Sequence, residues 1–381
     1  MIYFDNAATT KIYDDALTSY VQVSQKFFGN PSSLHQLGVD AYQVLTKARA
    51  QVASLLSVQP EEIFFTSGGT ESNNWAIKGT ALEKSVFGKH IITTKIEHPS
   101  VIQSCKQLER FGFEVTYLDV DSKGIVNVEQ LKESLRKDTI LVSVMAVNNE
   151  VGSIQPIAEI AQVLEEYPSI HFHVDAVQAI AKIPTEVERA SQLLDIGRID
   201  LLSLSAHKFH GPRGVGIMYK KFGRKIQALL TGGGQEKGER STTENLPGIV
   251  ATTKALRMAI EEKSVTGELR SQLWKELVTK PEIRIFSPEE GASHILCFAI
   301  KGVRGEVLVH AFENHGIYIS TTSACSSKKA DSSSTLYAMD VPTEWATGAV
   351  RVSLSNDNTT EEVEQFVDVL HQLMKQFSFL K

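Results

Sequence analysis

Cysteine is scarce in this chain of 381 residues, which holds only Cys105, Cys297 and Cys325. Three is an odd number, the residues lie far apart, and no C-x-x-C pair offers a metal site or a redox dithiol, so a disulfide framework is not expected. Cys105 and Cys297 stand among apolar or helical neighbours, which predicts small buried side chains. Cys325 lies in a polar run without hydrophobic periodicity, which predicts an exposed loop.

The chain also lacks a basic excess and long apolar runs. Its net charge of -6 argues against a nucleic-acid binder driven by a basic surface. The longest apolar runs, such as residues 140–147, are far shorter than the roughly 20 residues of a membrane span. Asp5 and Asn6 follow the first residue too closely for a secretory signal. We therefore expect a cytoplasmic protein without a metal site that binds neither membranes nor nucleic acid directly.

What the chain does contain is an alternation of strands and helices over its first two thirds. Its length exceeds one typical core and suggests two packed domains. Hydrophobic periodicity predicts helices at residues 41–56, 70–84, 128–136 and 157–166. Short apolar strands are predicted at residues 62–66, 90–94, 114–118, 140–147, 170–175 and 201–205. This alternation indicates an α/β fold with a mostly parallel sheet that is covered on both faces.

The pattern changes after about residue 250. A long helix is predicted over residues 252–277, followed by shorter elements of both kinds. The strands among them are expected at residues 283–286, 295–300 and 350–354, and the helices at residues 306–314 and 360–376. This part reads as a second, α+β domain.

The strongest local cluster is the run SLSAHKFHGPRGVG at residues 203–216. It leaves an apolar strand and ends in glycines that allow tight turns. Lys208, beside His207 and Ser205, can form an imine with an aldehyde cofactor if its amine is desolvated or lies near other cations. An isolated lysine here would be read as a surface residue, but the surrounding cluster favours a cofactor site.

Pyridoxal phosphate makes further demands that the sequence meets. Its ring nitrogen needs a carboxylate, and Asp175 closes a predicted strand at the end where ligands bind in open α/β sheets. Gln178 can donate a hydrogen bond to the phenolic oxygen. The phosphate favours a helix N-terminus, which the run SGGTES at residues 67–72 supplies together with the Thr70 hydroxyl. His98 follows the next strand and can stack on the ring.

Six further motifs accompany the lysine cluster in order along the chain. They are YFDNAATT at residues 3–10, GNPSSLH at 29–35, VNNEVG at 147–152, RSTTEN at 240–245, SACSS at 323–327 and VRVS at 350–353. Together these segments resemble the cysteine desulfurases of the class V aminotransferase family, which have pyridoxal-phosphate fold type I. The resemblance covers essentially the whole chain. It implies a large cofactor-binding domain over residues 14–251 and a small domain, formed by residues 1–13 and 252–381, that carries the catalytic cysteine loop.

The resemblance also assigns the cofactor. It implies that Lys208 holds pyridoxal phosphate covalently, that Asp175 pairs with the ring nitrogen, that Gln178 contacts the phenolic oxygen and that His98 stacks on the ring. The phosphate would be held by residues from two strand ends, namely Gly69, Thr70, Ser205 and His207.

The substrate and the partner subunit are assigned in the same way. Thr243 aligns with a threonine that reaches the phosphate from the neighbouring subunit, which implies a homodimer. Asn149 and Arg351 would bind the carboxylate of L-cysteine, the arginine bidentately, which a lysine could not reproduce. Cys325 would be the nucleophile, with His98 as the favoured acceptor of its thiol proton.

The activity that follows converts L-cysteine to L-alanine and leaves sulfur on Cys325 as a persulfide. An acceptor protein in iron–sulfur cluster assembly or in tRNA thiolation would then take this sulfur. Two alternatives stay open. One is a selenocysteine lyase or an aminotransferase of the same fold, and the other is a catalytically silent subunit that scaffolds sulfur transfer. Retention of both Lys208 and Cys325 weighs against the silent subunit.

Structural interpretations compete with several of these roles. Arg351 could form a structural ion pair, and Asp175 and Asn149 could be cap or turn residues. For His35 a structural role and a functional one are equally supported. Glu71 reads as an acid of the first helical turn rather than as a catalyst. The chain also departs from the family pattern, for example at residue 242, where relatives often have glycine and this chain has threonine.

Overall fold

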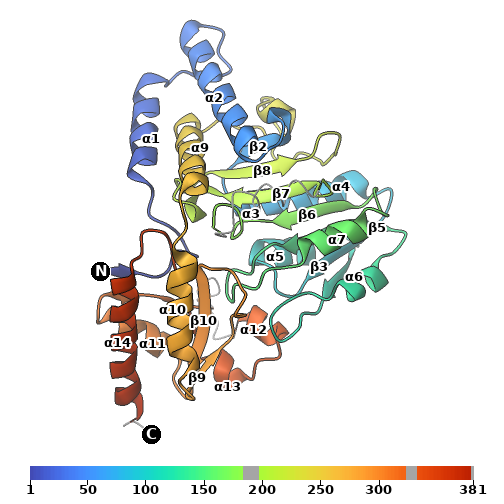
Figure 1. The fold of residues 1–381 in the computed structure, drawn as a ribbon. Helices are drawn as coiled ribbons and strands as arrows, with labels where there is room; N and C mark the ends of the chain where they lie inside the picture. Colours follow the sequence, from blue (N-terminus) through green and yellow to red (C-terminus); the bar gives the residue numbers. More distant parts are fainter. Residues whose placement is uncertain (183–196, 323–332, 379–381) are drawn as a thin grey trace.

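The computed structural model describes residues 1–182, 197–322 and 333–378. Figure 1 shows two bodies, an upper one around a large sheet and a lower one around a small sheet, with helices packed on each. Cys325 falls outside the described residues. Within the described part, no helix is both long enough and apolar enough to cross a membrane.

The upper body is built on a sheet of seven strands. In spatial order these are β2 (Ile63–Thr66), β8 (Gly216–Lys220), β7 (Leu201–Ser205), β6 (His171–Asp175), β5 (Thr139–Met145), β3 (His90–Thr94) and β4 (Glu114–Leu118). Strand β8 runs antiparallel to both of its neighbours, and the other pairs are parallel. Strands β3, β5, β6 and β7 are buried along their whole length, as expected of a sheet covered on both faces. The predicted mostly parallel α/β sheet is confirmed.

Helices cover both faces of this sheet (Figure 1). They are α1 (Asp14–Lys26), α2 (Gln36–Leu55), α3 (Gly69–Asn74), α4 (Thr80–Lys84), α5 (Pro99–Glu109), α6 (Val128–Ser134), α7 (Ile157–Leu164) and α9 (Leu246–Glu261). The predicted helix over residues 70–84 is present, but a π-helical turn, Trp75–Gly79, interrupts it. Helix α2 begins five residues earlier than predicted because His35 caps it, its side chain accepting a hydrogen bond from the Gly38 N–H.

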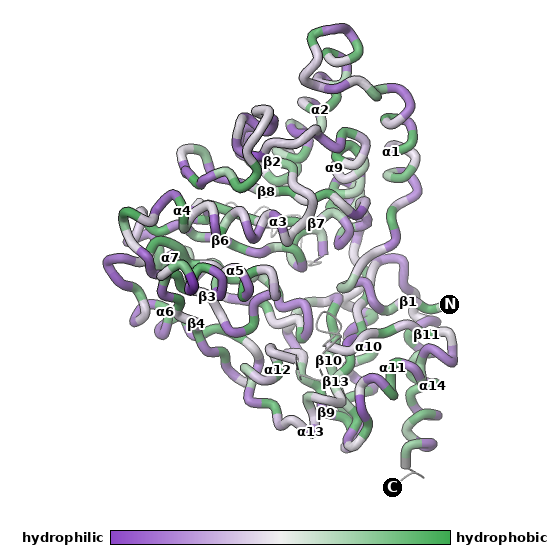
Figure 2. Tube along the Cα trace, turned by 180° about the vertical axis from the view of Figure 1, so that it is seen from behind, coloured by the Kyte–Doolittle hydropathy of each residue, from purple (hydrophilic) through white to green (hydrophobic). Residues whose placement is uncertain are grey.

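The lower body has an antiparallel sheet in the order β12 (Ser320–Thr321), β13 (Ala349–Ser353), β10 (Ile295–Ile300) and β9 (Ile283–Ile285). Its helices are α10 (Thr266–Val278), α11 (Gly305–Glu313), α12 (Ser334–Ala338), α13 (Thr343–Ala346) and α14 (Thr360–Ser378). Hydrophobic and hydrophilic residues alternate along α14 (Figure 2). One face of the helix packs on the core through Val363, Phe366 and Leu370, and the other face is polar. The Phe366 ring stacks on Phe312 of α11 at 4.5 Å.

The single helix predicted over residues 252–277 is two helices, α9 and α10. Helix α9 places Ala255 and Leu256 in the core of the large sheet, whereas α10 places Leu269 and Leu273 in the core of the small sheet. Since one straight helix cannot face both cores, the chain turns between them. The packing of α9 favours a domain boundary at residues 262–265. The predicted boundary at residue 251 stays a prediction.

The N-terminal segment joins the two bodies. Strand β1 (Ile2–Tyr3) pairs with β11 (Ile317–Tyr318) of the lower body, and Asp5 bridges to Ser353 of β13. A few residues later, the Thr10 N–H donates to the His207 carbonyl of the upper body at 2.9 Å. Residues 5–10 therefore run across the junction, beside the carboxyl ends of the large sheet's strands.

Candidate functional site

The strand ends of the large sheet bring the predicted cofactor residues together. Asp175 ends β6 and Ser205 ends the neighbouring parallel strand β7, with Asp175 in register with Ser203. Strand β7 leads directly into a 3-10 turn, Ala206–Lys208, that carries His207 and Lys208. Because the carboxyl ends of parallel strands meet at one edge, this is the edge at which open α/β sheets bind ligands.

The Asp175 carboxylate is buried and held by amide donors. Asn73 Nδ2 donates to its Oδ2 at 2.7 Å, and the Val177 N–H donates to its Oδ1 at 3.0 Å. Among the described residues no lysine or arginine is ion-paired with it, so its negative charge stays available to a cationic ligand group. Asn73 was not predicted. The only hint in the sequence is that Asn73 is a polar residue about one helical turn after the two glycines.

The turn between β2 and α3 is packed too closely for a side chain at Gly69. A Cβ added to Gly69 would lie 2.8 Å from Val177 Cγ2 and 3.4 Å from Ser205 Cβ. Gly69 and Thr70 open the helix, where backbone N–H groups lack partners within the helix and attract anions. This edge thus offers a cradle for a phosphate, formed by the residues predicted for it.

Lys208 reaches back to the N-terminal segment. Its Nζ donates to the carbonyls of Ala7 and Ala8, both at 2.7 Å. His207 lies beside it, with Nδ1 3.1 Å from Thr9 Oγ1, and burial together with the charge of Lys208 lowers its pKa to about 4. His207 is therefore neutral at physiological pH and can contact a phosphate only as a hydrogen-bonding group.

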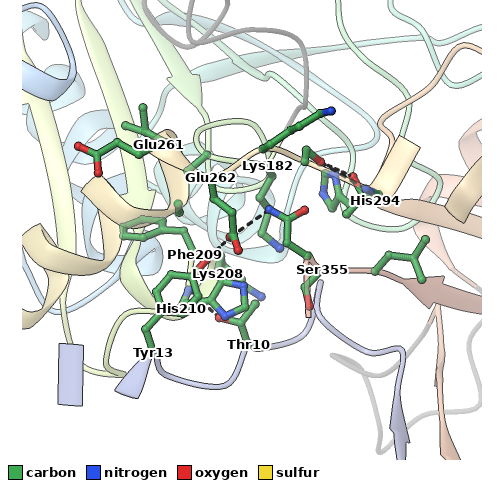
Figure 3. Close-up of a pocket in the computed structure, with 18 residues that line it drawn as sticks. Thr10, Tyr13, Lys182, Lys208, Phe209, His210, Glu261, Glu262, His294 and Ser355 are labelled. Atoms are coloured by element: carbon green, nitrogen blue, oxygen red, sulfur yellow. Dashed lines mark hydrogen bonds between the residues drawn. The ribbon is translucent and has the colours of Figure 1, made fainter. Parts of the chain in front are cut away.

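A cavity of about 370 Å³ borders Lys208 at the junction of the two bodies. Figure 3 shows the side chains of Lys182, Lys208, His210 and His294 around it. Thr70 and His98 line a separate hollow on the surface. In this structure, the predicted lysine and the predicted stacking histidine thus border different spaces, although they are close enough for Lys208 to influence the pKa of His98.

His98 caps α5 and has a defined protonation pattern. Its Nδ1 accepts the Ser100 N–H at 3.1 Å, so the neutral ring carries its proton on Nε2. Burial lowers the pKa of His98 below its ordinary value, Asp175 opposes this shift, and Lys208 adds to it. The ring is therefore neutral and offers an N–H donor. His98 also has a structural role, since it caps α5.

Gln178 is fixed by contacts within the chain. Its Nε2 donates to the Ala7 carbonyl at 2.9 Å, and its Oε1 lies 3.3 Å from His294 Nε2. The Ala7 carbonyl thus joins Gln178 to Lys208. His294 was not predicted, and its Nδ1 is buried without a partner.

Arg351 is buried on β13, and its contacts include the ion pair considered from the sequence. Its Nη2 donates to Asp5 Oδ1 and to Ser320 Oγ, both at 2.9 Å. Its Nη1 donates to the Asn149 carbonyl at 2.8 Å, so Asn149 contacts Arg351 through its backbone. The two residues predicted to bind a carboxylate are therefore neighbours, joined by a hydrogen bond.

Glu150 follows Asn149 and was not predicted. It accepts a hydrogen bond from the Ser333 hydroxyl, and Ser333 is the first described residue after the cysteine-containing stretch. Burial raises the pKa of Glu150 to about 7, an effect that Ser333 and the charge of Arg351 oppose. The 147–152 turn therefore contacts both Arg351 and the start of α12.

Comparison with known proteins decides the family. The family model described as aminotransferase class-V matches residues 2–366. The chain belongs to the class-V aminotransferase family. It is 54% identical to a "NifS/IcsS protein homolog" of Lactobacillus delbrueckii subsp. bulgaricus, over 99% of this chain and 98% of that one. It is 42% identical to "Cysteine desulfurase IscS" of Clostridium botulinum, over 98% of this chain and 94% of that one.

Solved structures of this family have the same fold. A "NifS-like protein" superposes with a TM-score of 0.89 at 40% identity, over 98% of this chain and 99% of that one. A structure titled "SspA in complex with cysteine" superposes with a TM-score of 0.82 at 32% identity, over 93% of this chain and 99% of that one. The resemblance found in the sequence and the fold it implied are confirmed.

Class-V aminotransferases are pyridoxal-phosphate enzymes, and the residues of this chain fit that group. The buried carboxylate of Asp175 can pair with a protonated ring nitrogen. Because a Cβ at Gly69 would collide with Val177, glycine lets the turn lie against the end of β7, where the backbone N–H groups of the helix start can bind a phosphate. Lys208 supplies the amine. Each feature fits a separate part of the cofactor.

Other predicted residues lie apart from this edge. Thr243 is exposed, and it lies in a small cleft with Ser67. Next to it, Arg240 forms a bidentate ion pair with Glu71, with N–O distances of 2.6 and 2.9 Å. Glu71 thus lies in the first helical turn, as predicted, and in addition ties the RSTTEN motif to the phosphate turn.

The remaining sequence predictions concern cysteines and His35. Cys105 and Cys297 are buried free thiols, as predicted, and burial raises the pKa of Cys105 to about 12. His35 is exposed and caps α2, which gives it the structural role of the two that were considered. The predicted nucleophile, Cys325, lies outside the described residues.

Proposed function

We propose that this class-V family member is a pyridoxal-phosphate-dependent cysteine desulfurase. It converts L-cysteine to L-alanine and passes the sulfur to Cys325. The observation that carries the proposal is the meeting of Lys208, Gln178 and Arg351 around one N-terminal segment. Asp175 lies three residues before Gln178, at the end of β6. This arrangement provides an amine for the cofactor, a counter-charge for its ring and a guanidinium for an amino-acid carboxylate. The names of the relatives, which include cysteine desulfurases and a protein solved with cysteine, support L-cysteine as the substrate.

The cofactor residues have separate tasks. When bound, pyridoxal phosphate supplies an aldehyde that captures amines and a ring that withdraws electrons from the substrate α-carbon. Lys208 would hold the cofactor through its amine, and the same amine would move the substrate α-proton. Asp175 keeps the proton on the ring nitrogen, and Gln178 contacts the phenolic oxygen. The phosphate is held by Gly69, Thr70, Ser205 and His207.

The substrate residues position the sulfur for transfer. Arg351 and Asn149 hold the α-carboxylate, which fixes the direction of the Cβ–Sγ bond. The Cys325 thiolate attacks the substrate sulfur, so that an S–S bond forms while the C–S bond breaks, and a proton completes the methyl group of alanine. The balance is L-cysteine plus a thiol giving L-alanine plus a persulfide, and no external oxidant is needed.

His98 is the candidate for proton transfer near the ring. Since Nδ1 is occupied by the Ser100 N–H, the exchangeable position is Nε2. With its proton on Nε2, the ring can donate a proton there but cannot accept one. Taking the Cys325 thiol proton at Nε2 therefore requires the other tautomer, with the proton on Nδ1 directed at Ser100 Oγ, 2.8 Å away. Stacking on the ring and proton transfer at Nε2 are compatible roles for one side chain.

The subunit arrangement and the sulfur acceptor are further parts of the proposal. Thr243 is exposed beside the phosphate turn, which supports a contact with a second subunit in a homodimer. The persulfide on Cys325 is delivered to an acceptor protein of iron–sulfur assembly or of tRNA thiolation. A pull-down of persulfide acceptors with intact Cys325, against a Cys325→Ser control, identifies which of the two it is.

The activity itself is tested with two variants. The holoenzyme is expected to absorb at about 400 nm, and Lys208→Ala should lose that band. Cys325→Ala should keep the band and lose alanine and sulfide formation from L-cysteine. A colourless wild-type protein, or a Cys325→Ala variant that works at the wild-type rate, would refute the proposal.

A lyase or aminotransferase activity is separated by the products. Radiolabelled L-cysteine should leave label on Cys325 as a persulfide. Faster turnover of L-selenocysteine without persulfide, or amino transfer to a 2-oxo acid, would favour the alternatives.

A further inference from the structure

Arg351 already donates most of its hydrogen bonds within the chain. Its guanidinium has five N–H donors. Nη2 uses both of its hydrogens, one toward Asp5 Oδ1 and one toward Ser320 Oγ, and Nη1 uses one toward the Asn149 carbonyl. Nε is buried and has no partner. The donors left over are thus Nε and one hydrogen of Nη1.

Those leftover donors cannot grip a carboxylate bidentately. A guanidinium has two edges with parallel N–H bonds that match a carboxylate, one formed by Nη1 with Nη2 and one by Nε with Nη2. Both edges include Nη2. As long as Nη2 donates to Asp5 and Ser320, a substrate carboxylate can receive only a single hydrogen bond from Arg351.

Of the two acceptors on Nη2, Asp5 is the one that resembles a substrate carboxylate. It carries the same charge on the same group, and it contacts Nη2 through one oxygen. Its side chain is 20% exposed, whereas that of Arg351 is 6% exposed. Asp5 is therefore the more exposed partner of the pair, whereas Ser320 belongs to strand β12.

A second basic side chain, Lys182, lies beside the same N-terminal segment. Lys182 donates to the carbonyl of the adjacent Asn6 at 3.2 Å. Burial and the charges of Lys208 and Arg351 lower the pKa of Lys182 well below its ordinary value, whereas Asp5 opposes that shift. Asp5 thus lies within electrostatic reach of Lys182 as well as of Arg351.

We propose that Asp5 is a built-in competitor for the α-carboxylate of the substrate on Arg351. It neutralises the buried arginine while the site is empty and is exchanged for the incoming carboxylate. The exchange replaces one carboxylate by another, so the buried arginine is never left without a counter-charge, which would be costly. A carboxylate must therefore bind Arg351 more strongly than Asp5 does in order to replace it. Anions that bind weakly, or through a single hydrogen bond, are excluded. The identity of the substrate rests on the proposed function.

The test compares carboxylate binding in the holoenzyme, wild type against Asp5→Asn. Asparagine keeps the size and the acceptor oxygen but loses the charge. The product L-alanine is the probe, because it binds without sulfur transfer, and its dissociation constant is read from the visible spectrum of the cofactor. We expect L-alanine to bind about tenfold more tightly to Asp5→Asn, since only a hydrogen bond to a neutral amide, and no longer an ion pair, has to be displaced from Arg351. Equal or weaker binding would overturn the proposal.

Acetate provides a readout that depends neither on sulfur chemistry nor on turnover. Without ligand, Asp5→Asn should melt at a lower temperature than the wild type, because Arg351 is left buried and unpaired. Acetate should raise the melting temperature of Asp5→Asn more than that of the wild type. Equal shifts would contradict the proposal. If acetate raises the two melting temperatures by different amounts but neither protein desulfurates L-cysteine, the proposed function is wrong and the competition on Arg351 is still supported.

Two control variants separate the charge from the position. Asp14→Asn removes the same charge from an exposed site near the N-terminus and should leave L-alanine binding unchanged. Ser320→Ala removes the neutral acceptor on Nη2 and should change the dissociation constant less than Asp5→Asn does. If Ser320→Ala tightens binding as much, competition between like charges is not the cause.

Discussion

Asn73 and Asp175, 102 residues apart in the sequence, are joined by a buried hydrogen bond of 2.7 Å. The same amide nitrogen also donates to Ser100 Oγ at 2.9 Å, which fixes its direction. A neutral donor orients the carboxylate without cancelling its charge, whereas a lysine or arginine at this position would compete with the ring nitrogen of the cofactor. The pair thus holds Asp175 ready for a cationic ligand.

The first prediction removes this donor. In Asn73→Ala, Asp175 loses a hydrogen bond to a charged group, so we expect the affinity of the apoenzyme for pyridoxal phosphate to fall about tenfold or more. Titration of the apoenzyme, followed by visible absorbance, measures it. Asn314→Ala, at an exposed position of the lower body, is the control and should bind normally. A wild-type affinity in Asn73→Ala would show that Asp175 needs no support.

The second prediction concerns Glu97, which lies next to His98. Its Oε1 accepts from Thr94 Oγ1 and from the Met145 N–H, both at 2.8 Å, while Oε2 is buried without a partner. Burial raises the pKa of Glu97 to about 8. The folded state therefore keeps a proton that the unfolded state loses above its ordinary pKa. The contribution of Glu97 to the free energy of unfolding is therefore fully present at acid pH and falls as the pH rises toward 8.

Glu97→Gln should remove that dependence. Glutamine imitates the protonated acid. The free energy of unfolding of Glu97→Gln, relative to that of the wild type, should therefore increase between pH 5 and 8, by at most about 1.4 kcal/mol per pH unit. Urea unfolding of both proteins at several pH values measures the difference. A constant difference across this range would mean that Glu97 is ionised in the folded protein.

The third prediction separates the two roles of His98. His98→Phe keeps a ring for stacking and loses the proton on Nε2, so it should retain the cofactor band while turnover of L-cysteine falls about 100-fold or more. His98→Ala should lose cofactor affinity as well. If His98→Phe turned over normally, His98 would be a stacking and capping residue only.

The fourth prediction tests whether Thr243 acts across a subunit boundary. Lys208→Ala and Thr243→Ala are co-expressed with different tags, and the mixed dimer is purified. If Thr243 serves the partner, the subunit that keeps Lys208 receives an intact Thr243, and about half of the wild-type activity should return. Each variant alone should be weaker than this mixture. If Thr243 serves its own subunit, the mixed dimer contains no complete site and its activity stays low.

The sequence predicted best what lies close together along the chain. Asp175 and Lys208 follow strands, so their position at the sheet edge could be inferred from local pattern alone. The partners of these residues could not. Asp5 reaches Arg351 across 346 residues, and Asn73 carries no local signature that separates it from a surface amide.

The elements show the same limit. Helix α9 and helix α10 have a continuous helical pattern, and only the two separate cores that they face divide them. Strand β8 was not predicted, although its residues are apolar, because its antiparallel place beside β7 depends on the turn that follows Lys208.

The path of the N-terminal segment has a consequence for biosynthesis. Ile2 pairs with Ile317, and Asp5 bridges to Ser353, while the carbonyls of Ala7 and Ala8 hold Lys208. Ile2 and Tyr3 thus find their partners only after more than 300 further residues have been made. Contacts of such high sequence separation form late. The N-terminal segment therefore reaches its place between the two bodies only after strands β11 and β13 have been made.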